Sequence, residues 1–167
     1  VRIGDRPRAT TLLQESLLIY RQIGDEAGTA SALNNLDEAL GDELIGSGLA
    51  REALEIALRL DAPYLIAPAN LHLGVAAMRT GDLRAAGAFL STALRNFQLA
   101  DNPIFSCEAI ELIAEVMEAS DPAAAARLLG GTAGYRASNG IEWEGYHASR
   151  AKQLGRRLAR RFGEARY

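Results

Sequence analysis

The stretch LHLGVAAMRTGDLRAAGAFLSTAL, residues 71–94, consists of two apolar segments joined by Thr80-Gly81-Asp82. Ala, Gly and Leu recur in each segment at intervals of three and four residues, which is the spacing of one face of an α-helix. Gly-Asp marks a turn between the segments. The stretch therefore predicts two antiparallel helices that approach closely because their contact residues, Gly74 and Ala86, are small.

Related segments occur around Leu36 and Leu112 and after Gly4-Asp5, so the unit of helix, turn and helix recurs about every 36–41 residues. A period of this length is typical of helical solenoids, in which each unit buries its apolar face against its neighbours. We predict an all-α fold, a right-handed α-α superhelix. A half unit and three full units would occupy residues 1–140, and a basic capping helix over residues 141–167 would close the same domain.

The composition favours a helical fold and indicates the cellular compartment in which the protein is expected. The chain has 167 residues, of which 49% are hydrophobic and 6% aromatic, and Ala and Leu dominate the apolar set. Cys107 is the single cysteine, so no internal disulfide is possible and a reducing compartment is expected. We expect a cytoplasmic protein, since no run of 18 apolar residues and no signal peptide occur. The chain begins at Val1 and not Met, and we expect it to be part of a longer protein.

The pattern Leu73-Gly74, Gly81-Asp82 and the spaced Ala residues resembles the tetratricopeptide repeat. LLQESLLIYRQIGDEAGTASALNNL (12–36) and DPAAAARLLGGTAGYRASNG (121–140) further resemble the repeat arms of large bacterial LuxR-type and STAND-class ATP-binding transcription regulators. The resemblance implies a repeat arm beside a signalling ATPase, and it implies no chemistry, cofactor or metal within this chain.

In tetratricopeptide arrays the first helix of each unit lines a concave groove that binds peptides. On this chain the groove would be acidic at one end and apolar at the other, which would suit an amphipathic helix. The alternative is that the chain's own C-terminal helix fills its apolar end. The groove positions carried onto this chain are Asn34, Glu38, Asp42, Leu71, Val75, Met78, Arg79, Ile110, Ala114 and Met117.

The charge is unevenly distributed along the chain. Residues 1–149 carry 11 basic and 20 acidic side chains, a net charge of −9, whereas residues 150–167 carry 7 and 1, a net charge of +6. We expect a capping helix whose arginines are solvated or face acidic helices; contact with nucleic acid or an acidic protein is the alternative. This basic surface consists of Arg150, Arg156, Arg157, Arg160 and Arg161.

Isolated residues that resemble catalytic or metal-binding groups have simpler structural explanations. His72 and His147 are expected on separate helices, and Cys107 is expected as buried apolar filler. Gly130-Gly131 and Gly134 are expected to serve helix packing or helix termination, since a phosphate loop requires a preceding strand. The run Glu108, Glu111, Glu115 and Glu118 is expected as a solvated helix face, with a metal or catalytic carboxylate pair as the alternative.

The sequence thus predicts a non-catalytic arm for protein-protein interaction or effector sensing, part of a bacterial signalling or transcription regulator, with no membrane partner. Two alternatives remain: a stand-alone scaffold or oligomerisation module, and a nucleic-acid-binding adaptor that uses helix 147–162. Helix 8–22 exposes part of its apolar face in this scheme, and we expect self-association through it.

Overall fold

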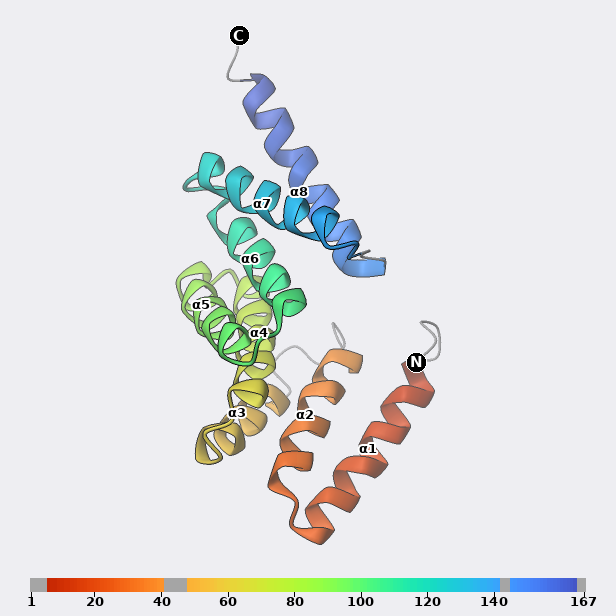
Figure 1. The fold of residues 1–167 in the computed structure, drawn as a ribbon. Helices are drawn as coiled ribbons and strands as arrows, with labels where there is room; N and C mark the ends of the chain where they lie inside the picture. The colour runs from red at the N-terminus through yellow and green to blue at the C-terminus, as the bar shows by residue number, and fades with distance from the viewer. Residues whose placement is uncertain (1–5, 41–47, 142–144, 165–167) are drawn as a thin grey trace. The chain divides into compact units, whose positions relative to one another are not determined.

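A computed structural model describes residues 6–40, 48–141 and 145–164 of the chain (Figure 1). These residues form eight helices and no strand, which confirms the all-α prediction. None of the described helices is long and apolar enough to cross a membrane. The helices are α1 (Arg6–Ile23), α2 (Glu26–Leu40), α3 (Leu49–Arg59), α4 (Pro63–Arg79), α5 (Leu83–Leu99), α6 (Pro103–Met117), α7 (Pro122–Ser138) and α8 (Gly145–Glu164).

The turns between helices use the residues that the sequence marks. At Gly81 the backbone has φ +80°, a conformation that favours glycine, and Asp82 then accepts a hydrogen bond from the Ala85 amide at 2.9 Å. Asp121 caps α7 in the same way, accepting from the Ala124 amide at 2.8 Å. The predicted turn at Gly4-Asp5 lies outside the described residues.

Two further turns share a second design. Asp61 and Asp101 both adopt positive φ, at 48° and 49°, and each is followed two residues later by the proline that begins the next helix. Proline suits the first helical position because its missing amide would have no partner there. The helix ends therefore follow directly from local sequence.

The helices group into two compact units, Val1–Asp101 and Asn102–Tyr167. In the first unit α2 packs against α1, α3 and α4, and α5 packs against α4. In the second unit α6 packs against α7, and α8 packs against both. The boundary between the two compact units falls after α5. Helix α8 packs with α6 and α7.

The core of the first unit is built largely from leucine and small residues. Leu33 and Ala53 are fully buried there, as are Leu90 and Ala86 in the α4–α5 pair. Gly74 is buried, and a β-carbon at this position would lie 2.7 Å from the Leu90 side chain. The predicted close approach at Gly74 is therefore present, but the residue nearest to Gly74 is Leu90, not Ala86 as the sequence predicted.

Candidate functional site

The predicted groove residues of the first unit differ in exposure. Asn34 and Leu71 are buried, and the Asn34 side-chain amide donates a hydrogen bond to the Leu65 carbonyl at 3.2 Å, which links α2 to α4. Glu38 and Arg79 are exposed, and Val75 and Met78 are partly buried; Asp42 lies outside the described residues. Asn34 and Leu71 thus contribute to the interior and do not present their side chains to a partner.

The predicted groove residues of the second unit lie on α6. Ala114 is fully buried, and Ile110 and Met117 are partly buried. Ala114 belongs to a small core with Ala125 of α7 and with two leucines of α8, and Met117 packs against this core. The surface around Ala114 and Met117 is therefore occupied by the chain's own C-terminal helix, one of the two outcomes that the sequence left open.

Helix α8 contributes its apolar residues from one face. Leu154 and Leu158 are 1% and 3% exposed, and among residues 149–163 they are the two side chains that are buried. Arg150, Arg157 and Arg161 lie before, between and after these leucines at intervals of three and four residues. All five positions therefore lie on the same side of the helix. We call these five residues the inner face of α8.

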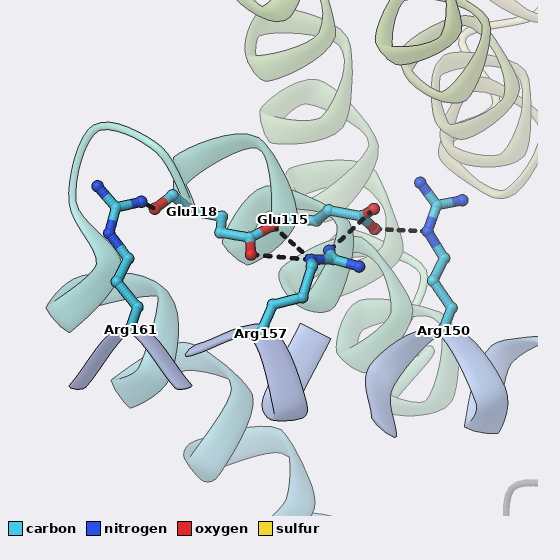
Figure 2. A network of polar contacts seen from close by, with 5 residues as sticks. All are labelled: Glu115, Glu118, Arg150, Arg157 and Arg161. Carbon is cyan, nitrogen blue, oxygen red and sulfur yellow. Dashed lines mark hydrogen bonds and ion pairs between the residues drawn. The ribbon is translucent and has the colours of Figure 1, made fainter. Parts of the chain in front are cut away.

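The three arginines of this inner face contact the last turn of α6 and the two residues that follow it (Figure 2). Arg150 pairs with Glu115, with Nε and Oε2 2.5 Å apart. Arg157 Nε donates to both carboxylate oxygens of Glu118, at 2.8 and 2.9 Å, and its Nη2 lies 3.5 Å from Glu115. The hydrogen bond to Glu118 raises the pKa of Arg157, so this guanidinium stays charged.

Arg161 binds the end of α6 through the backbone. Its two terminal nitrogens donate to the carbonyls of Glu118 and Ala119 at 2.9 and 3.3 Å. The last carbonyls of a helix have no intrahelical partner and carry partial negative charge, so a cation stabilises them. The partner surface, which we call the acidic face of α6, consists of Glu115, Glu118 and these carbonyls.

The predicted basic surface is thus divided between two sides of α8. Arg150, Arg157 and Arg161 are engaged with α6, whereas Arg156 and Arg160 are exposed together with Lys152. Positions 152, 156 and 160 are four residues apart and form one stripe, which we call the outer face of α8. Within the described part of the chain, these three residues have no carboxylate partner.

The expectation of a solvated glutamate face on α6 is wrong. Glu108 and Glu111 are each 8% exposed, and Glu115 and Glu118 are covered by arginines. Glu111 pairs with Arg136 of α7 and accepts a hydrogen bond from the Thr132 hydroxyl at 2.8 Å. The carboxylates therefore hold α6 against its neighbours, because each buried charge requires a partner.

Other candidate groups are placed as follows. Cys107 is buried, which raises the pKa of its thiol, and Arg136 acts in the opposite direction. Nδ1 of His72 lies 3.6 Å from a carboxylate oxygen of Asp37. The side chain of His147 is outside the described residues. Groups of three or more His, Cys, Asp or Glu suited to a metal are absent from the residues that the structure describes.

The glycines at 130, 131 and 134 all lie within α7, so neither a preceding strand nor a phosphate loop is present there. A β-carbon at each would meet nothing within 4 Å. The expectation that these glycines allow close helix packing or end the helix is therefore wrong, and nothing in the structure explains their presence.

A hollow lies between α6 and α8 in the second unit. Its lining includes Glu108, Leu112, Glu115, Arg150 and Ala151. Ala151 faces this hollow with a side chain of one carbon, so α8 leaves space beside α6 instead of filling it. The hollow is bordered by the same ion pairs that hold α8.

Helix α1 carries the largest group of exposed apolar residues on any described helix. Leu12, Ile19 and Ile23 are 53%, 53% and 69% exposed. Their spacings of seven and four residues place them on one side of the helix, next to the side that packs Leu13 and Leu17 against the core. Among the described helices α1 packs against α2, so this second apolar side, the outer face of α1, is uncovered.

No protein-family model matches the chain, and no curated protein matches it significantly.

Proposed function

We propose that this chain is a non-catalytic arm for protein-protein interaction or effector sensing, built as a tetratricopeptide-like right-handed superhelix. The outer face of α1 is the observation that carries the proposal. A stripe of three aliphatic residues, each more than half exposed, lies beside a well-packed core, and exposed apolar faces of this kind mark interaction sites.

The sequential packing of neighbouring helices supports the repeat architecture. In the first unit α2 contacts the following two helices, and α4 contacts α2, α3 and α5. In the second unit α8 contacts α6 and α7 in turn. Such nearest-neighbour packing is the rule in solenoids.

The ionisable groups support a non-catalytic role. Glu111 and Glu115 are paired with arginines, and burial keeps the Cys107 thiol protonated near neutral pH by raising its pKa. A general base needs a carboxylate that can reach a substrate, and a nucleophilic cysteine needs a lowered pKa. These side chains are instead engaged in holding the second unit together.

On the basis of the resemblance in sequence, we propose that this arm is part of a larger bacterial signalling or transcription regulator. Detection of the native gene product in extracts of source cells, with an antibody raised against this chain, tests this placement. A band several times larger than 17.9 kDa supports the regulator arm. A band near 17.9 kDa contradicts it and favours the alternative, a stand-alone scaffold or oligomerisation module.

The outer face of α8 supports a second candidate function, a nucleic-acid-binding adaptor. Lys152, Arg156 and Arg160 form a short cationic stripe, and phosphate contacts of this kind give affinity that falls steeply with salt. Binding of duplex DNA at several salt concentrations tests this role. The adaptor function requires that Arg156→Glu combined with Arg160→Glu abolishes binding, and it is excluded if the original chain does not bind at low salt.

A further inference from the structure

We propose that the acidic face of α6 is a docking site for a basic amphipathic helix of another polypeptide, and that α8 is a displaceable occupant of this site. The proposal rests on the protein-binding function above and specifies the chemistry of one partner. This docking site lies on α6 and binds its partner largely through charge, whereas the outer face of α1 is apolar.

The contacts of α8 define what the site recognises. Two leucines four residues apart, Leu154 and Leu158, enter the small core beside Ala114 and Met117. Three arginines, Arg150, Arg157 and Arg161, contact Glu115, Glu118 and the carbonyls at the end of α6. Arg157 and Arg161 follow Arg150 by seven and eleven residues. A partner helix would therefore carry arginine at positions 1, 8 and 12 and leucine at positions 5 and 9.

The attachment of α8 is of a kind that another helix can replace. Its buried apolar contribution within residues 149–163 is limited to two side chains, and the hollow beside Ala151 leaves α6 incompletely covered. The ion pairs are partly open to solvent: the side chains of Arg157 and Glu118 are 43% and 23% exposed. Partly exposed ion pairs are screened by salt and are weak individually.

Covalent attachment gives α8 an advantage over any external helix. An attached segment competes at an effective concentration on the order of millimolar, so an external helix of equal intrinsic affinity binds weakly while α8 remains in place. The apparent dissociation constant equals the intrinsic one divided by the fraction of molecules with an open site. A change that releases α8 without altering α6 should therefore strengthen external binding.

A labelled synthetic peptide of residues 145–164 serves as the probe, and the full 167-residue chain is the receptor. Arg157→Glu in the chain places a negative charge opposite Glu118 and releases α8. Arg156→Glu is the matched control, since it makes the same change of charge one residue away on the outer face. By fluorescence anisotropy, we expect the R157E chain to bind the peptide at least about tenfold more tightly than the original and R156E chains.

Specificity is tested with two altered peptides. A peptide carrying Arg157→Glu and a peptide of scrambled sequence should each lose binding to the R157E chain by about tenfold or more, and binding of the original peptide should weaken as salt increases. Circular dichroism shows whether the R157E chain stays helical. If it does not, Arg150→Glu replaces it as the releasing change under the same criteria.

Equal peptide affinity of the helical releasing variant and the R156E chain would overturn the proposal. Undiminished binding of the scrambled peptide would overturn it as well, because simple attraction between opposite charges would then explain the signal. Either result would remove the docking site on α6 and leave the proposed function intact, because that function depends on the outer face of α1 and not on α8.

Discussion

Gly74 shows how one residue fixes the distance between two helices. The sequence predicted its role, because a Leu-Gly pair precedes the Gly-Asp turn at the repeat spacing. The structure supplies the partner: the fully buried Leu90 side chain occupies the space that a β-carbon would need. The repeat pattern predicted Ala86 as the residue opposite Gly74, whereas the nearest residue is Leu90, one turn further along α5. The exact opposing residue depends on the rotation of α5 about its axis, which the sequence pattern does not determine.

We expect Gly74→Ala to lower the free energy of unfolding by about 1–3 kcal/mol, since the added methyl group overpacks the contact with Leu90. Gly87→Ala is the control. Gly87 lies in α5, and a β-carbon there meets nothing within 4 Å. The control should be stabilised by about 0.5–1 kcal/mol because alanine favours the helix. Urea denaturation measures both, and equal effects would contradict the proposed contact.

Cys107 provides a prediction about pH. Burial raises the pKa of its thiol in the folded chain above the ordinary value of about 8.5. The folded state then holds a proton that the unfolded state has lost, so the free energy of unfolding decreases as pH rises above about 8.5, by at most about 1.4 kcal/mol per pH unit. At lower pH the thiol has no such effect.

Urea denaturation of the original chain and of Cys107→Ala between pH 7 and 10 tests this prediction. The alanine variant should show a flatter decline above pH 8.5, because titrations elsewhere in the chain are common to both proteins. Parallel curves over the whole range would show that the thiol titrates equally in the folded and unfolded states.

At the scale of elements, the sequence predicted the helices and most of their ends, because caps, prolines and glycines act locally. It did not predict the role of the glutamates on α6. Glu108, Glu111 and Glu115 follow the spacing of a solvated helix face. That they are covered becomes evident only in the structure, where Arg136 of α7 pairs with Glu111 and Arg150 of α8 pairs with Glu115. The excess of arginine after residue 149 was the available signal, since a basic helix in an otherwise acidic chain has nearby carboxylates to pair with.

The pair between Glu111 and Arg136 is the element-scale contact most sensitive to mutation. Their side chains are 9% and 14% exposed, so removing the negative charge takes the carboxylate away from a poorly solvated guanidinium. We expect Glu111→Gln to lower the free energy of unfolding by about 2–3 kcal/mol.

Glu52→Gln is the matched control for that change. Glu52 pairs with Arg21 at 2.5 Å, but both side chains are about half exposed, at 44% and 50%. The control should change stability by less than about 1 kcal/mol. If Glu111→Gln is as stable as this control, the buried ion pair between Glu111 of α6 and Arg136 of α7 does not stabilise the fold.

At the scale of the whole molecule, the predicted groove and the outer face of α1 are two candidate locations for the protein-binding surface. The groove positions fall in both compact units, and Asn34, Leu71 and Ala114 are buried within their own unit. The exposed stripe on α1 lies within one unit and depends on no contact between the two. We therefore propose that the main protein-binding surface of the chain is the outer face of α1.

We expect the isolated chain to self-associate through this stripe. Sedimentation velocity should give a sedimentation coefficient that rises with protein concentration, and Ile19→Glu should abolish the rise by introducing a charge into the stripe. Gln14→Glu is the control, since position 14 lies on the opposite side of α1. A chain that remains monomeric at all concentrations would exclude self-association, and other protein partners would then be the remaining candidates.

Site-specific photocrosslinking of the native gene product in its source cells tests the central claim most directly. A photoreactive amino acid replaces Ile19 in one sample and Gln14 in the other, and mass spectrometry identifies any attached polypeptide. We predict crosslinks from position 19 to one defined protein surface, on a second copy, on another part of the same polypeptide or on a separate protein, and no such crosslink from position 14. Equal crosslinking from both positions, or none from position 19, would contradict the assignment of α1 as a protein-binding surface.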